Sequence, residues 1–214
     1  MTKPEKAQEI IKILKREYPN PKCGLVYARG RPHELLVAAR LSAQCTDKRV
    51  NAVTPALFAE FPSVEAFAAA ELSDIERVIR PCGLYKTKAA DIKGMCAALI
   101  AGFGGAVPEE IDDLLALSGV GRKTANLIRG ELYGKPALVA DTHVIRLSER
   151  LGLTRNPGKS AVKAERELLK IIPGGESLAF CHRLVLHGRS VCKARNPDCG
   201  DCVLSGVCDY GGKR

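Results

Sequence analysis

The chain has 214 residues, of which 46% are hydrophobic, so it is long and apolar enough to fold around one large core or two small ones. Lysine and arginine outnumber aspartate and glutamate by 33 to 24, and the net charge of +9 indicates a polyanion as partner, a property shared with ribosomal and membrane-surface proteins. The polar N-terminus has no apolar signal core, and no stretch approaches the roughly 18 apolar residues of a membrane span, which predicts a cytoplasmic protein.

Apolar residues recur at helical spacing along most of the chain, and no strand-like alternation of useful length competes with them. The clearest helical patterns cover residues 7–14, 50–61 and 85–103. Two capping-box spacings and one first-turn proline mark helix starts, at Thr2 with Glu5, at Ser73 with Glu76 and at Pro32. Pro55 predicts a kinked or split helix within residues 47–60. The sequence therefore predicts an all-α fold.

A short glycine turn separates two helical patterns within residues 114–130. Gly119 and Gly121 flank one valine, and glycine permits a tight turn with positive φ and lets backbone N–H groups approach an anion closely. The second helix begins at this turn, so the positive end of its dipole points to the same place. Arg122 and Lys123 add positive charge beside it. The segment predicts a phosphate site, with a helix–helix turn that binds nothing as the alternative.

The nine cysteines fall into two groups. Five lie in apolar helical stretches, where small buried thiols are ordinary core residues: Cys23, Cys45, Cys82, Cys96 and Cys181. The other four follow the spacing Cys-x6-Cys-x2-Cys-x5-Cys and are Cys192, Cys199, Cys202 and Cys208. Four thiolates at these intervals suit either zinc or an iron–sulfur cluster. One tight pair with two longer arms favours a cluster, because zinc sites usually show two close pairs.

Five segments of the chain occur in the order that one protein family shows. They are Leu41-Ser42-Ala43-Gln44-Cys45-Thr46-Asp47, Gly83-Leu84-Tyr85-Lys86-Thr87-Lys88-Ala89, Leu117-Ser118-Gly119-Val120-Gly121-Arg122-Lys123-Thr124-Ala125, Val139-Ala140-Asp141-Thr142-His143 and the terminal cysteines. On these motifs, from about residue 5 to 210, the chain resembles the endonuclease III family, the iron–sulfur branch of the helix-hairpin-helix DNA glycosylases. Ser118 departs from that pattern, in which proline is common, and predicts a less rigid turn.

The resemblance implies two helical domains with a DNA-binding cleft between them. Residues 22–133 would form a helical domain that contains the helix-hairpin-helix, and residues 1–21 with 134–214 would form a discontinuous iron–sulfur domain. The resemblance also assigns a 4Fe–4S cluster to the four terminal cysteines. Such a cluster would be architectural, because excision by an amine and a carboxylate needs no redox step.

The resemblance further implies a bifunctional DNA glycosylase and abasic-site lyase that excises oxidised pyrimidines in base excision repair. It assigns the nucleophilic amine to Lys123 and the assisting carboxylate to Asp141. An amine can displace a base from C1′ and form a Schiff base that allows β-elimination. The helix N-terminus, Arg122 and partial burial all favour the neutral amine that attack requires. From the residues alone, Lys123 is equally a solvated phosphate-binding lysine and Asp141 a helix cap.

An enzyme that acts at C1′ must turn the nucleotide out of the duplex, and a side chain must fill the gap. By resemblance, Gln44 enters the vacated space and Leu84 wedges beside the opposite strand, although a core leucine is the simpler interpretation of Leu84. The remaining predicted DNA contacts are Gly119, Gly121, Arg122, His143, Arg189, Lys193 and Arg195. The last three are equally a solvated charge run.

The expected partner is double-stranded DNA that contains damaged bases or abasic sites, bound by a monomer that is associated with the nucleoid in a prokaryote. One alternative is a mismatch or adenine glycosylase of the same superfamily, although those relatives generally lack the nucleophilic lysine. The other is a non-catalytic DNA-binding module with an iron–sulfur or zinc site. Scission of a thymine-glycol duplex separates that module from the enzymes.

Overall fold

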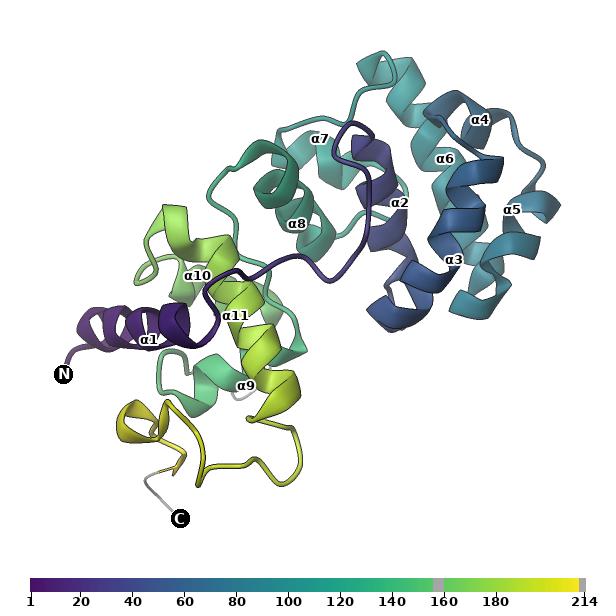
Figure 1. The fold of residues 1–214 in the computed structure, drawn as a ribbon. Coiled ribbons are helices and arrows are strands. Elements are labelled where there is room, and N and C mark those ends of the chain that lie inside the picture. The colour runs from purple at the N-terminus through teal and green to yellow at the C-terminus, as the bar shows by residue number, and fades with distance from the viewer. Residues whose placement is uncertain (156–159, 212–214) are drawn as a thin grey trace. The chain divides into compact units, whose positions relative to one another are not determined.

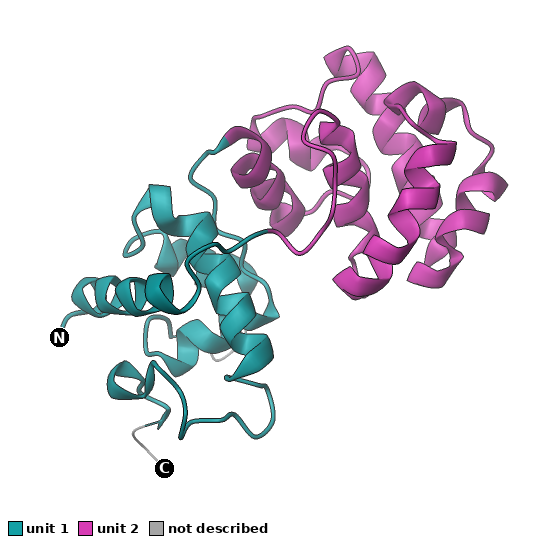
Figure 2. Cartoon of the chain, in the orientation of Figure 1, with its two compact units in different colours: residues 1–22, 134–214 teal, residues 23–133 magenta. Residues whose placement is uncertain are grey.

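The computed structural model describes residues 1–155 and 160–211, which form two compact units (Figure 2). The hairpin unit comprises residues 23–133, and the terminal unit comprises residues 1–22 and 134–214. Every regular element in the described ranges is an α-helix or a short 3₁₀-helix, which confirms the all-α prediction. None of the helices described there has both the length and the apolar character needed to cross a membrane.

The hairpin unit consists of seven α-helices and one short 3₁₀-helix (Figure 1). Its elements are α2 (Pro32–Leu41), α3 (Asp47–Glu60), α4 (Val64–Ala69), α5 (Leu72–Ile79), η1 (Arg80–Cys82), α6 (Tyr85–Phe103), α7 (Ile111–Ala116) and α8 (Arg122–Tyr133). Almost all of α2 is buried, as expected for a helix with apolar residues on every face. α6 contacts α2, α4 and α5, and the core side chains Phe67, Ile75 and Ile92 of these helices are fully buried.

The terminal unit brings the two ends of the chain together. Its elements are α1 (Lys3–Glu17), α9 (Thr142–Arg150), α10 (Ala161–Leu168), η2 (Gly174–Glu176), α11 (Ser177–Ser190) and η3 (Ser205–Val207). α11 contacts both α1 and α9 and buries Phe180 and Leu184. α1 buries its apolar face in the same unit, with Ala7, Ile10, Ile11 and Leu14. The first helix therefore completes the core of the segment that carries the terminal cysteines.

The structure confirms two of the three predicted helix starts and corrects the third. Thr2 Oγ1 accepts a hydrogen bond from the Glu5 backbone at 3.5 Å, and Glu5 Oε2 accepts one from the Thr2 backbone at 2.7 Å, so the capping box of α1 is present. Pro32 is the first residue of α2, as predicted. Ser73 is wrong as a helix cap, because α5 already begins one residue earlier, at Leu72.

Of the kinked or split helix predicted at Pro55, the split is wrong, because α3 runs through this proline as one helix. A proline inside a helix removes one backbone hydrogen bond. α3 buries Val50 and Leu57 on either side of Pro55, and Thr46 caps the helix by accepting a hydrogen bond from the Arg49 backbone at 3.3 Å. Packing on both sides of Pro55 and the cap at Thr46 therefore offset the lost bond.

Candidate active site and cluster loop

The predicted glycine turn lies between α7 and α8, and its two glycines have different roles. Gly119 has a φ of +71°, and a Cβ atom there would lie 2.5 Å from Arg40 Nε, so both the backbone and the packing require glycine. Gly121 has no positive φ, and a Cβ atom there would meet no described atom within 4 Å. The open space beside the exposed backbone of Gly121 suits the close approach of an anion.

A shielded ion pair anchors this turn to the body of the hairpin unit. Ser118 Oγ donates a hydrogen bond to Asp91 Oδ1 at 2.8 Å, and Arg40 Nη2 lies 2.6 Å from Asp91 Oδ2. The side chains of Arg40 and Asp91 are only 13% and 19% exposed. Ser118 thus constrains the turn through a hydrogen bond to α6, where a proline would do so through its ring.

Lys123 lies in the first turn of α8, directly after Arg122, the residue at which the helix begins. The side chains of both residues are exposed. The partial burial expected for Lys123 is therefore not found. An exposed amine at the positive end of a helix dipole is accessible to a polyanion.

Asp141 belongs to the terminal unit and caps α9, as the cap interpretation predicted. Its Oδ1 accepts a hydrogen bond from the Val144 backbone at 2.8 Å. An ionised carboxylate offers about four lone-pair sites, so capping leaves acceptor capacity for chemistry. Two residues further along, His143 Nδ1 lies 3.1 Å from Arg146 Nη2, which also donates to the carbonyl oxygen of Cys192 at 3.0 Å. Asp141 thus precedes a helix, α9, that also contacts the segment of residues 192–208 with the four terminal cysteines, the cluster loop.

Gln44 and Leu84 share an unusual backbone conformation. Their φ angles are +53° and +49°, in the left-handed region that residues other than glycine rarely adopt. Both side chains are exposed, Leu84 by 57%, so the interpretation of Leu84 as a core leucine is wrong. Such strained positions persist only where the surroundings impose them, and they cluster at functional sites.

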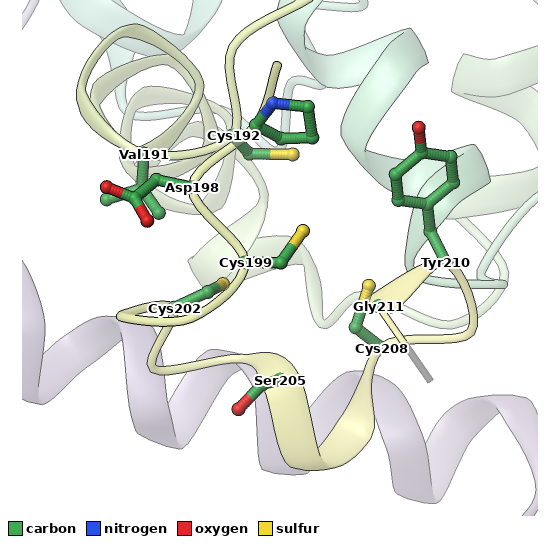
Figure 3. A pocket seen from close by; sticks show the side chains of 10 residues that line it. Val191, Cys192, Asp198, Cys199, Cys202, Ser205, Cys208, Tyr210 and Gly211 are labelled. Carbon is green, nitrogen blue, oxygen red and sulfur yellow. The ribbon is translucent and has the colours of Figure 1, made fainter. Parts of the chain in front are cut away.

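The four terminal cysteines line one shared pocket (Figure 3). In the described part of the chain, no three cysteine, histidine, aspartate or glutamate side chains lie close enough together to ligate a single metal ion. A zinc site needs four ligands within about 2.3 Å of one centre, whereas the thiolates of a 4Fe–4S site are held apart by the cluster between them. Four sulfurs around one shared pocket fit the thiolate ligand set of a 4Fe–4S cluster.

Arg150 holds the first cysteine of this set. Its Nη1 donates to Cys192 Sγ at 3.2 Å and to the carbonyl oxygen of Lys193 at 2.8 Å. Its guanidinium lies 4.6 Å from the centre of the Tyr210 ring, a cation–π distance. Arg150 thereby ties the beginning of the cysteine loop to its end.

His187 approaches a second cysteine from α11. Its Nε2 lies 3.4 Å from Cys202 Sγ, and its Nδ1 lies 3.1 Å from the Tyr18 hydroxyl. Burial lowers the pKa of His187, which favours a neutral imidazole that can donate from Nε2 and accept at Nδ1. Burial also raises the pKa of the Cys202 thiol, and the neighbouring cysteines raise it further. The positive charge of bound metal would favour the thiolate form of Cys202.

The cations predicted to contact DNA from this loop are exposed. Arg189 lies in the last turn of α11, and Lys193 and Arg195 lie between the first two cysteines. Asn196, beside Arg195, has a φ of +48°, which turns the chain sharply within the loop. A loop held by four cysteines carries these charges at low conformational freedom, so less entropy is lost when they meet a phosphate.

Comparison with known proteins agrees with these features. Residues 37–173 match the model for HhH-GPD superfamily base excision DNA repair proteins, and residues 192–208 match the iron–sulfur binding domain of endonuclease III. Endonuclease III of Synechocystis sp. is 45% identical over 208 residues, which cover 97% of this chain and 93% of the relative. The chain belongs to the endonuclease III family. Endonuclease III of Escherichia coli strain K12 is 38% identical over 205 residues, which cover 96% of this chain and 95% of the relative.

Solved structures of the endonuclease III family show the same fold. A trapped endonuclease III–DNA covalent intermediate superposes with a TM-score of 0.93 at 41% identity, covering 100% of this chain and 99% of that chain. Family membership confirms the predicted class of enzyme, a base excision repair DNA glycosylase and lyase that binds DNA. It also confirms the cofactor, a 4Fe–4S cluster.

Several residues that hold the site together were not predicted from the sequence. Arg40 and Asp91 are separated by 51 positions, and Arg150 and Cys192 by 42, so no local pattern joins them. His187 had a weak signal, because it is a histidine in an apolar helical run five residues before the first cysteine of the cluster loop.

Proposed function

We propose that this endonuclease III family enzyme excises oxidised pyrimidines from double-stranded DNA and cleaves the resulting abasic sites, with Lys123 as nucleophile and Asp141 as assisting carboxylate. The position of Lys123 carries this proposal: it is an exposed amine in the first turn of α8, directly after a glycine turn with space for a phosphate. A phosphate held by the amides of Gly119 and Gly121 and by Arg122 places the sugar next to that amine.

The reaction needs one amine and balances without an oxidant. Lys123 Nζ attacks C1′, the glycosidic bond breaks, and the base leaves with its bonding electron pair and takes up a proton. The amine loses a proton and the sugar ring opens, which gives a protonated Schiff base. Loss of a proton from C2′ then expels the 3′ phosphate, and water releases the enzyme by hydrolysis. The products are a free base and a nicked strand.

Asp141 assists this chemistry as a carboxylate held by α9. Its charge favours positive charge on the sugar as the base departs, and its free lone pairs accept a proton from the attacking amine. Lys123 belongs to the hairpin unit and Asp141 to the terminal unit, so the proposed reaction requires both units to contact the same DNA.

Gln44 and Leu84 are proposed to fill the gap that the extruded nucleotide leaves. The exposed amide of Gln44 can hydrogen-bond to the unpaired base, and the exposed side chain of Leu84 can enter between base steps and unstack them. Their left-handed backbone supports this role, because exposed side chains gain no core packing that would compensate for the strain.

The cluster loop is proposed to bind the phosphate backbone. Cys192, Cys199, Cys202 and Cys208 are the proposed ligands of the 4Fe–4S cluster, which when bound supplies a rigid, cationic anchor for four thiolates. Lys193 and Arg195, which lie within the loop, would contact phosphates together with Arg189 and His143 of the same unit. Their contribution is independent of DNA sequence and falls with rising salt. The enzyme would act as a monomer in the cytoplasm, associated with the nucleoid in a prokaryote.

Substitution of Lys123 by Gln tests the proposal. We expect the wild type to release base from a thymine-glycol duplex and to be trapped on it by borohydride, because reduction fixes the Schiff base. The Lys123→Gln enzyme should lose both reactions and still bind DNA, since the glycine turn and Arg122 remain. Lys12→Gln is the matched control, because Lys12 is a surface lysine with a 70% exposed side chain.

Trapping that survives in Lys123→Gln would show that another amine is the nucleophile. G·T and A·G mismatch duplexes belong in the same experiment. Release of base from a mismatch but not from thymine glycol would replace the proposed substrate class, and binding without any base release would leave only the DNA-binding role.

A further inference from the structure

A buried lysine joins the two loops that carry Gln44 and Leu84. Lys88, on α6, has no solvent-exposed surface. Its Nζ donates hydrogen bonds to the carbonyl oxygens of Leu41 at 2.8 Å and of Cys82 at 2.9 Å. Because Leu41 and Cys82 are the last residues of α2 and η1, one ammonium group caps the carboxyl ends of two helical elements.

Each capped end leads directly into a predicted DNA contact. Gln44 follows Leu41 by three residues, and Leu84 follows Cys82 by two. Gln44 and Leu84 are two of the three non-glycine residues with positive φ in the described part of the chain. A single buried cation therefore fixes the starting points of both strained loops.

Core stability alone gives a poor account of a lysine at this position. Lys88 shares the buried face of α6 with Ile92 and Cys96, where an apolar side chain would fill the space without desolvating a charge. Burial lowers the pKa of Lys88, which reflects that cost. Hydrogen bonds to the two carbonyl oxygens offset the cost of desolvating the ammonium group. Because hydrogen bonds are directional, they also fix the spacing between the two loops.

We propose that Lys88 is a positioning residue for nucleotide extrusion, which sets the separation of Gln44 and Leu84 before DNA arrives. This inference rests on the proposed role of those two side chains. Side chains that are already in position lose less conformational entropy when they enter the duplex, so the free-energy cost of opening the duplex is lower. Lys88 itself touches neither DNA nor the reacting atoms.

Substitution of Lys88 by Met tests this inference, because Met has a similar length and no donor. Lys93→Met is the matched control: Lys93 lies on the same helix and donates to the Ala70 carbonyl oxygen at 2.7 Å, at the joint between α4 and α5. Extrusion is measured by the fluorescence of 2-aminopurine next to a stable abasic analogue in a duplex. Strand scission at an abasic site in single-stranded DNA measures the chemistry without a gap to fill.

We expect Lys88→Met to reduce the rate of opening of the duplex, and of base release from it, about tenfold or more, since small misplacements have effects of this size. Scission of single-stranded DNA should stay close to wild type, and Lys93→Met should change neither. A double-mutant cycle adds a second measurement. In a Gln44→Ala and Leu84→Ala background, Lys88→Met should cause little further loss of opening, because the side chains it positions are gone.

Lys88→Gln retains a shorter donor and provides a folded variant for the same assays if Lys88→Met does not fold. Equal losses on duplex and single-stranded substrates, or equal losses in the Lys88 and Lys93 variants, would overturn the positioning role. A wild type that neither cleaves nor is trapped would instead contradict the proposed function, so the two failures are distinguishable.

Discussion

Removal of the Asp91 carboxylate is expected to destabilise the hairpin unit well beyond the effect of an ordinary surface charge. Asp91→Ala breaks the ion pair with Arg40 and the hydrogen bond from Ser118, whose donor–acceptor distance is 2.8 Å. Hydrogen bonds to charged groups contribute roughly 1.5–3 kcal/mol, and a shielded Arg40 left without its partner adds a desolvation cost. Because Arg40 and Asp91 keep 13% and 19% exposure, we expect a total loss of about 3 kcal/mol in the free energy of unfolding.

Urea denaturation followed by far-UV circular dichroism measures this loss. Glu60→Ala is the control, because it breaks the Glu60–Arg77 pair of the same unit, in which the two side chains are 38% and 62% exposed. That exposed pair should contribute less than about 1 kcal/mol to the free energy of unfolding, and its contribution should fall further at high salt. Equal losses in Asp91→Ala and Glu60→Ala would refute the reasoning that burial makes the Asp91 network strong. A double-mutant cycle with Ser118→Ala should show a coupling of about 1 kcal/mol.

Two further predictions concern the glycine turn and the cluster. Gly119→Ala should lower the free energy of unfolding by about 2 kcal/mol in thermal or urea unfolding, because Gly119 has a positive φ and lies against Arg40. Gly121→Ala should change the free energy of unfolding by no more than about 0.5 kcal/mol and should weaken DNA binding in a fluorescence anisotropy titration. The reverse pattern would contradict the roles given to these glycines. The Cys199→Ser protein should lose iron and the brown visible absorbance of the cluster. The control Cys181→Ser should keep both, because Cys181 is a buried cysteine of the same unit. Iron retained at full stoichiometry in Cys199→Ser would remove that cysteine from the ligand set.

Patterns within a few residues were sufficient for much of the fold. Helical spacing of apolar residues predicted the all-α class, and Thr2 with Glu5 and Pro32 marked two helix starts correctly, because caps act within one turn. The split predicted at Pro55 and the cap predicted at Ser73 were wrong, because neither local pattern alone decides where a helix begins or ends. Packing of Val50 and Leu57 holds α3 together through the proline, and such packing is not visible in the local sequence.

The sequence by itself determined which chemical groups the protein has: a glycine turn followed by an arginine and a lysine, an aspartate at a helix start, and four cysteines at fixed intervals. Tertiary structure decided how these groups are held. Arg40 reaches Asp91 across 51 residues, and Lys88 reaches Leu41 across 47, so only the folded path of the chain brings them together. The left-handed backbone of Gln44 and Leu84, and the shared pocket of the four cysteines, likewise became visible only in the folded chain. Local propensity acts over about one helical turn, whereas burial and long-range hydrogen bonds depend on contacts between residues that are distant in the sequence.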